Sequence, residues 1–218
     1  MKEMITYNTQ IKQYLKQNID LYGNELYFDS SEALSIHTHI LDDYYKVLSN
    51  CEICNIEDKN NFLFASGSNN TRIMFIGESK AESENFKLNA FAGKSHQLFK
   101  KMLNSIDLNI EDIFMVNIFK CCESADLYES TEVNSCRTYL NKQIEILEPK
   151  LIVALGQVSA CSLLEKRLDM VDLRDELFQY NGVDFYVTYH PNDLLNNPKF
   201  KRSSWEDLKY IRKNYLND

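Results

Sequence analysis

Acidic side chains follow directly after a segment that is typical of a buried strand. The stretch RIMFIGESKAESEN, residues 72–85, begins as an apolar run and changes character at Gly77. Glu78, Glu82 and Glu84 come next. Such acids can simply support the start of a following helix, and Glu84 alone fits that interpretation. They can also form a catalytic loop, because a carboxylate can take a proton from water and stabilise a nearby cation.

Polar residues also follow other apolar runs of the chain. Asn117 lies near the end of DIFMVNIF, and His190 near the end of FYVTYHP. Each has an ordinary explanation, a turn residue for Asn117 and a buried histidine for His190. In a parallel sheet, however, ligands bind at the carboxyl ends of the strands. Glu78, Asn117, Gly156 and His190 would then share one edge, where chemistry can take place.

The cysteines offer a second kind of chemistry. The chain has six of them, at positions 51, 54, 121, 122, 136 and 161. Cys51 and Cys54 form a CxxC pair, and Cys121 and Cys136 add two separated thiols. Four thiolates can hold either Zn²⁺ or an iron–sulfur cluster, and buried cysteines without a metal are the plainer alternative. Cys161, within QVSACSLL, is expected to pack as a small apolar side chain.

Alternating strands and helices must position these residues. Apolar runs predict four strands, at 72–78, 112–119, 151–156 and 185–191. Amphipathic patterns predict helices at 95–106, 131–150, 157–168 and 203–216. Strands separated by helices indicate right-handed crossovers. The fold class is therefore α/β, with a central four-stranded parallel sheet and helices on both of its faces.

The first fifty residues have a different pattern. Residues 1–50 show apolar side chains at helical spacing, with a stop at Gly23. We expect residues 1–50 to form a helical extension packed on the domain. Residues 51–218 would form the α/β domain.

Composition narrows the class of protein. The 218 residues carry a formal net charge of −8, and we find neither a membrane-length apolar run nor a signal peptide. We therefore expect a cytoplasmic protein without a membrane partner, acting as a monomer. The acidic charge argues against a surface that binds nucleic acid everywhere. It leaves room for a local basic face from Lys199, Lys201, Arg202, Lys209, Arg212 and Lys213.

Taken together, these motifs resemble one known family. CEIC, FASGSNNTRIMFIGES, AFAGKSHQLF, NIFKC, the run from Cys136 to Ala160 and TYHPNDLLNNPKF occur in the order typical of the iron–sulfur (family 4) uracil-DNA glycosylases. The resemblance extends from about Cys51 to the end of the chain. It implies an α/β/α sandwich and an enzyme that releases uracil from DNA, leaving an abasic site after flipping the base into a pocket.

The resemblance also implies roles for single residues. A [4Fe–4S] cluster, with Zn²⁺ as the alternative, would be held by Cys51, Cys54, Cys121 and Cys136. Catalysis would depend on Glu78, Glu84 and His190, with His190 near the uracil carbonyl. Phe91 would stack on the flipped base and Asn117 would bind its Watson–Crick edge. Gly77 and Ser79 would complete the substrate site.

Some positions depart from the family pattern. GESKAESEN has Lys80 and Ala81 where proline and glycine are usual, and residues 123–132 are acidic where the family is basic. Asn192 and Asp193 replace small residues after His190. The altered GESKAESEN motif and the acidic residues 123–132 favour an alternative, a cluster-bearing nucleic-acid-binding module with weak or lost glycosylase activity. A zinc-stabilised interaction domain is a further alternative.

Overall fold

The structure is a computed structural model, and it describes residues 41, 43–46, 65–68, 71–78, 93–118 and 131–216. The chain divides into two units, Met1–Ile36 and His37–Asp218, and every described residue belongs to the second unit. The boundary expected after residue 50 and the first predicted helix lie outside the described residues and stay predictions. In the part of the chain that the structure describes, no helix is long and apolar enough to cross a membrane.

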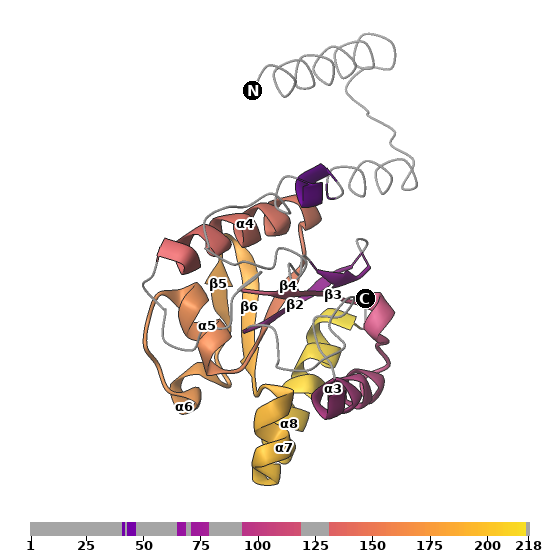
Figure 1. Cartoon of the computed structure of the whole chain (residues 1–218). Helices are drawn as coiled ribbons and strands as arrows, with labels where there is room; N and C mark the ends of the chain where they lie inside the picture. Colours follow the sequence, from indigo (N-terminus) through magenta and orange to yellow (C-terminus); the bar gives the residue numbers. More distant parts are fainter. Residues whose placement is uncertain are drawn as a thin grey trace, which may run out of the picture. The chain divides into compact units, whose positions relative to one another are not determined.

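A six-stranded sheet forms the centre of the described unit (Figure 1). The strands are β1 (Ser66–Gly67), β2 (Ile73–Gly77), β3 (Phe114–Asn117), β4 (Leu151–Leu155), β5 (Phe178–Tyr180) and β6 (Val183–Thr188). Their order is β1-β3-β2-β4-β6-β5, and the four central strands are parallel. The four predicted parallel strands are confirmed. The sheet gains an antiparallel strand at each edge, β1 beside β3 and β5 beside β6.

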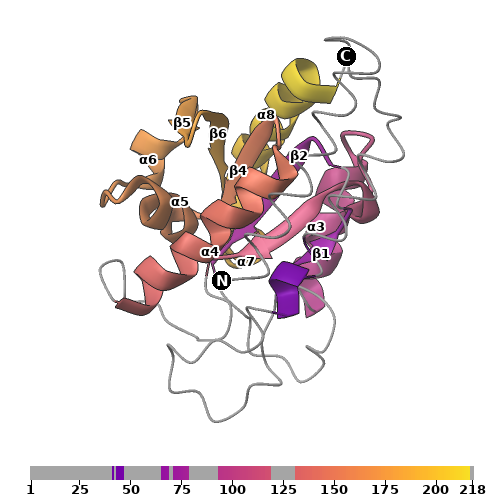
Figure 2. The same ribbon diagram turned by 90° about the horizontal axis from the view of Figure 1, so that it is seen from above.

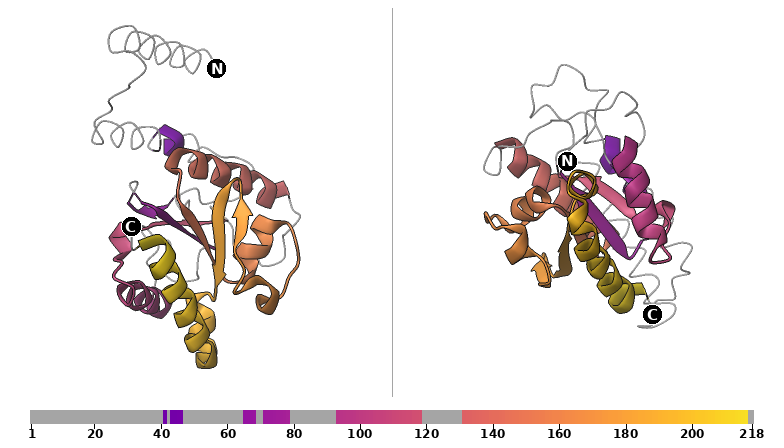
Figure 3. Two further views of the ribbon diagram at one scale, coloured as in Figure 1. Left: turned by 180° about the vertical axis from the view of Figure 1, so that it is seen from behind. Right: turned by 90° about the horizontal axis from the view of Figure 1, so that it is seen from below.

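Helices cover both faces of this sheet (Figures 2 and 3). They are α3 (Gly93–Asn104), α4 (Thr131–Leu147), α5 (Gln157–Leu164), α6 (Met170–Leu173), α7 (Pro191–Asn196) and α8 (Lys201–Ile211). Buried side chains of α4, α5 and α6 belong to one apolar cluster, and those of α3, α7 and α8 to the other. The three-layer α/β/α architecture is thus confirmed.

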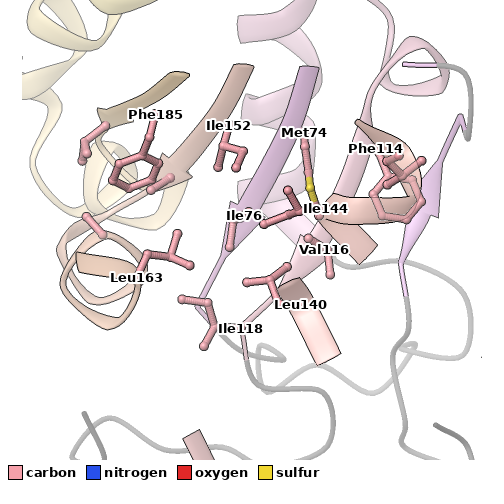
Figure 4. Packing of buried hydrophobic residues seen from close by; sticks show 14 of the residues in the cluster. Met74, Ile76, Phe114, Val116, Ile118, Leu140, Ile144, Ile152, Leu163 and Phe185 are labelled. Atoms are coloured by element: carbon pink, nitrogen blue, oxygen red, sulfur yellow. The ribbon is translucent and has the colours of Figure 1, made fainter. Parts of the chain in front are cut away.

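The strand β2 shows why the central strands are apolar throughout. Met74 and Ile76 pack into the cluster under α4, while Ile73 and Phe75 pack into the cluster under α3. All five residues of β2 are buried, as expected where helices cover both faces of a sheet. Figure 4 shows the first cluster, in which Met74 and Ile76 lie near Ile144 of α4.

Positive backbone φ angles set several element ends. The predicted helix over 157–168 stops at Leu164, because Glu165 takes a left-handed conformation with φ 54°. The helix predicted to end at Pro149 stops at Leu147, and Glu148 has φ 46°. A residue in the left-handed conformation turns the chain out of the helix. Both predicted helices are confirmed, but each ends a few residues earlier than predicted.

The edge strand β5 joins β6 through a tight turn. Asn181 and Gly182 form the two-residue loop, with φ values of 51° and 82°. Two positive φ angles define the type I′ turn that matches the twist of a hairpin. Asn-Gly is the usual sequence for this turn, and it was the signal in the sequence from which β5 could have been predicted.

Candidate active site

The carboxyl ends of the parallel strands meet at one edge, as predicted. Gly77 at the end of β2 pairs in register with Asn117 at the end of β3. The Gly156 amide, just after β4, donates a hydrogen bond of 2.8 Å to the carbonyl of Thr188, the last residue of β6. Four strand ends therefore present their following residues to the same side of the molecule.

A cavity of about 340 Å³ opens at this edge. Its described lining consists of Glu78, Gly156, Gln157, Val158, His190, Asn192 and Asp193. Two predicted catalytic residues, Glu78 and His190, are thereby brought together. Asn117 is not among the described lining residues of the cavity, and it lies one strand away from Glu78, opposite Gly77.

Asn117 has an unusual buried amide. The residue is 1% exposed, and among the described residues neither Oδ1 nor Nδ2 has a hydrogen-bond partner. Leaving a buried polar atom unpaired costs about 1–3 kcal/mol. An amide that offers both a donor and an acceptor at a ligand-binding edge is suited to a ligand with the matching pair.

The imidazole of His190 is held by the helix that it caps. Asn192 N donates a hydrogen bond of 3.2 Å to His190 Nδ1, at the start of α7. Burial lowers the pKa of His190 to about 4, so the ring is neutral at neutral pH. Because Nδ1 accepts a hydrogen bond, the single ring proton lies on Nε2. The Nε2–H group can then donate to a ligand.

Gly156 allows a close approach between the end of β4 and the His190 turn, the connection from Thr188 of β6 to Pro191 of α7. Its φ is +87°, a conformation that residues with side chains rarely adopt. A Cβ atom at this position would lie 3.0 Å from His190 Cβ and 3.8 Å from Asp193 Oδ2. Glycine is therefore favoured here by the backbone conformation, and a side chain would also crowd His190.

Two carboxyl groups line the same cavity. Burial raises the pKa of Glu78 above its ordinary value, and the negative charge of Asp193 raises it further. Burial also raises the pKa of Asp193, opposed by a hydrogen bond from the His190 backbone. A carboxylate with a raised pKa is a better base, so Glu78 is equipped to take a proton from water.

Sequence reasoning did not place Asp193 or Gln157 in the site. In the sequence, Asp193 stands out only as a departure from the family pattern. Gln157 lines the cavity, but its Nε2 donates to the Leu168 carbonyl at 2.8 Å, which ties the start of α5 to the loop before α6. Gln157 directly follows the strand predicted at 151–156, and that position is the signal that could identify it. Asp193 lies within α7, and no local pattern marks it.

Several predicted site residues lie outside the described residues. They are Ser79, Glu84 and Phe91, together with the cysteines Cys51, Cys54 and Cys121. Cys136 is described and is 3% exposed, near the beginning of α4. Within the described ranges, no group of three or more histidine, cysteine or acidic side chains could hold a metal ion.

Cys161 behaves as the sequence suggests. It is 2% exposed and packs in the cluster under α4. Its Sγ accepts from Leu168 N at 3.4 Å and donates to Leu168 O at 3.3 Å. This thiol therefore ties α5 to the loop that leads to α6.

The fold and site define a class: an α/β/α protein with a ligand cavity at the carboxyl edge of its parallel sheet, lined by an acid and a neutral histidine. The model of the uracil DNA glycosylase superfamily matches residues 64–209. The chain belongs to this superfamily, and the prediction of an enzyme of the glycosylase class is confirmed at the level of the family.

Curated relatives agree with this assignment. The chain is 29% identical over 173 residues to the type-4 uracil-DNA glycosylase of Saccharolobus solfataricus, which covers 74% of this chain and 80% of that protein. It is 28% identical to the type-4 enzyme of Archaeoglobus fulgidus, over 78% of this chain and 91% of the relative. It is 30% identical to that of Sulfurisphaera tokodaii, over 74% and 79%.

Proposed function

We propose that this protein is a DNA repair glycosylase that hydrolyses the N-glycosidic bond of deoxyuridine in DNA. It would release uracil and leave an abasic site. Its superfamily membership and the type-4 uracil-DNA glycosylases among its relatives support the reaction class. A base inside a duplex is out of reach of the sheet edge, so the nucleotide would have to flip into the cavity.

The buried amide of Asn117 is the observation that carries this proposal. Its Oδ1 and Nδ2, which have no hydrogen-bond partner among the described residues, match the uracil edge, where N3–H is a donor and O4 is an acceptor. Cytosine presents the reverse pattern, an acceptor at N3 and an amino donor at C4. An amide held in one orientation would therefore favour uracil over cytosine.

The other site residues would supply the chemistry. Water oxygen would bond to C1′ of the sugar as the bond from C1′ to N1 breaks, and the bonding electron pair would leave with uracil. Glu78 or Glu84 would accept the proton of the attacking water and favour the cationic sugar. The neutral His190 would donate from Nε2 to a uracil carbonyl oxygen as negative charge develops there. The proton held by the carboxylate would finally return to solvent.

Substrate positioning would use residues around the same edge. Phe91 would stack on the flipped base, and Gly77 and Ser79 would contact it through the backbone. Gly77 is the last residue of β2, and the predicted loop with Ser79 and Phe91 lies in the sequence between β2 and α3. The proposed location is the cytoplasm, and the proposed assembly state is a monomer.

A [4Fe–4S] cluster would be held by Cys51, Cys54, Cys121 and Cys136, with Zn²⁺ as the alternative. The burial of Cys136 supports this assignment, because a ligand thiolate shielded from water suits such a group. The bonds of Cys161 to Leu168 remove it as a competing ligand. When bound, the cluster would cross-link the chain before β2 to the start of α4.

DNA would contact the segment that follows the His190 turn. Lys199, Lys201 and Arg202 are exposed there, in η3 (Pro198–Phe200) and at the start of α8. They form a local basic surface on a chain of net charge −8. Phosphate binding needs this kind of local charge, so the surface supports binding next to the cavity.

Asp193 gives specific support to the alternative function. Its carboxyl group lines the cavity, where a second negative charge would repel DNA phosphate. A nucleic-acid-binding module with weak or lost glycosylase activity would tolerate this charge better than an efficient enzyme. Activity on a defined substrate separates the two functions.

The decisive experiment is cleavage of a labelled oligonucleotide with one uracil, single- and double-stranded, followed by alkali. We expect strand cleavage at the uracil with the parent protein and strongly reduced cleavage with Glu84→Ala, whose DNA binding should be retained. Asn117→Asp should lose discrimination between uracil and cytosine, because an acceptor cannot donate to O4. Gln97→Glu, which adds the same charge at an exposed position of α3, is the control. A folded, DNA-binding parent that cleaves neither substrate would establish the alternative.

A further inference from the structure

A buried polar network lies behind the His190 turn, outside the cavity lining. At its centre is Asp207 of α8, which is 0% exposed. Arg174 donates to it twice, from Nε to Oδ2 at 3.1 Å and from Nη2 to Oδ1 at 2.6 Å. Thr188 Oγ1 donates to Asp207 Oδ2 at 2.6 Å and lies 3.1 Å from Ser204 Oγ. The carboxylate thus accepts three side-chain hydrogen bonds.

This network contacts Thr188 and Tyr189, the two residues that precede His190. Thr188 is bonded to Asp207 through its side chain and to Gly156 through its carbonyl. The guanidinium of Arg174 lies 5.1 Å from the centroid of the Tyr189 ring. A second contact on Tyr189 comes from Phe200, whose ring stacks on it with 4.5 Å between the ring centroids.

Stability alone does not explain a network of this kind. Removing a carboxylate and a guanidinium from water is expensive, and apolar side chains of similar size often stabilise a protein as well or better. The guanidinium of Arg174 has a raised pKa because of its hydrogen bonds to Asp207, so it stays charged. Three elements, the loop after α6, the end of β6 and α8, are joined at one point.

We propose that Asp207, Arg174 and Thr188 are positioning residues that fix the His190 turn relative to the cavity. None of the three is among the described lining residues of the cavity, so they act by holding the backbone just before His190 and not by touching the substrate. Asp207 holds Thr188 from one side, and Arg174 holds both Asp207 and the Tyr189 ring. The inference deepens the proposed function, on which its kinetic part depends.

The test compares three substitutions of threonine. Thr188→Val removes the hydroxyl and keeps the shape, whereas Thr188→Ser keeps the hydroxyl. Thr71→Val is the matched control: Thr71 is 8% exposed, and its Oγ1 lies 2.9 Å from the carbonyl oxygens of both Ile73 and Asp112, to either of which its one proton can be donated. Both valine variants lose a buried hydroxyl, so both should lower the melting temperature.

The expected kinetic result is specific to one variant. Thr188→Val should cleave uracil-containing DNA on the order of tenfold more slowly in single turnover, with unchanged DNA affinity, because small misplacements of a catalytic group are costly. Thr188→Ser should restore the parent rate, and Thr71→Val should not reduce it. A parent rate in Thr188→Val would overturn the proposal.

A second readout needs no glycosylase activity. The ring nitrogen resonances of His190 in an NMR spectrum, assigned with His190→Asn, should shift in Thr188→Val and stay in place in Thr71→Val. If Thr188→Val does not fold, Arg174→Lys replaces it, since lysine cannot form the paired bonds to Asp207. Unmoved His190 resonances in the folded variant would refute the positioning role, even if the parent proved inactive on uracil and the proposed function failed.

Discussion

Glu78, just after β2, and Asp193, in the first turn of α7, line one cavity, and the charge of Asp193 raises the pKa of Glu78. The two residues are more than a hundred positions apart in the sequence. Burial is the larger cause of the raised pKa, and the second carboxylate adds to it. The pH dependence of the proposed reaction should therefore change when the charge of Asp193 is removed.

We predict that Asp193→Asn moves the acidic limb of the pH–rate profile to lower pH. Removing the charge of Asp193 lowers the pKa of Glu78, so Glu78 remains ionised in more acidic solution. Single-turnover rates between pH 4 and 8 measure the limb. Asp172→Asn, at an exposed position of α6, should leave it unchanged. If the acidic limb of Asp193→Asn matched that of the parent, the ionisation of Glu78 would not control the cleavage rate.

His190 should couple stability to pH. Its pKa is about 4 in the folded chain, against 6.5 without burial, so the unfolded chain binds the extra proton between these values. The free energy of unfolding should therefore fall as the pH drops from about 6.5 to 4, by up to about 3 kcal/mol. Denaturant titrations of the parent and His190→Gln across this window make the comparison. The other three histidines are common to both proteins, and equal pH slopes would contradict the low pKa.

Gly156→Ala should damage both stability and cleavage. A φ of +87° disfavours alanine, and its Cβ would meet His190 Cβ at 3.0 Å. Such strain costs about 1–3 kcal/mol. Gly182→Ala is the control, because Gly182 has φ +82° with nothing within 4 Å of its Cβ position. Both variants should melt earlier in a thermal scan, but only Gly156→Ala should slow cleavage; equal rates in the two would show that the His190 turn tolerates displacement.

Substituting each of the two buried cysteines in the described part of the chain should have opposite effects on bound iron. Cys136→Ser should lose bound iron, sulfide and visible absorbance if Cys136 is a cluster ligand. Cys161→Ser should keep all three, because Cys161 Sγ is engaged with Leu168. Both changes alter a buried thiol, so misfolding alone would affect them alike. Iron retained in purified Cys136→Ser would exclude this cysteine from the ligand set.

The basic surface after the His190 turn should set the salt dependence of DNA binding. Removing Lys201 and Arg202 together should reduce the slope of log affinity against log salt by about 2. Lys166→Ala serves as the control, because Lys166 follows α5 on the opposite face of the sheet. Fluorescence anisotropy at several salt concentrations gives the slopes. A slope equal to that of the parent would place DNA elsewhere.

The sequence was most informative where burial dictates a simple pattern. The central strands β2 and β4 are continuous apolar runs because helices cover both faces, and this is visible without a structure. The strand β1 pairs through only two residues, Ser66 and Gly67, which is too short for any periodicity. It forms because β3 offers an open edge, and that depends on tertiary contacts.

Some residues of the candidate site could also be predicted from the sequence, and others could not. Glu78, Asn117 and His190 could be placed at one edge, because the ends of parallel strands must lie together. The role of Asp193 could not be predicted, because the approach of the His190 turn to Gly156 decides which side chains enter the cavity. The bonds of Asp207 to Arg174 and Thr188 span 33 and 19 positions, beyond the reach of any local pattern.

The turn at Asn181 and Gly182 has a consequence for how the chain acquires its fold. A type I′ hairpin needs only local contacts and can form on a timescale on the order of microseconds. The strand β6, which leads into His190, would thus be paired with β5 before the slower parallel crossovers close. We expect folding to begin at this hairpin, so the strand that carries the histidine would serve as the nucleus on which β4 and then β2 assemble.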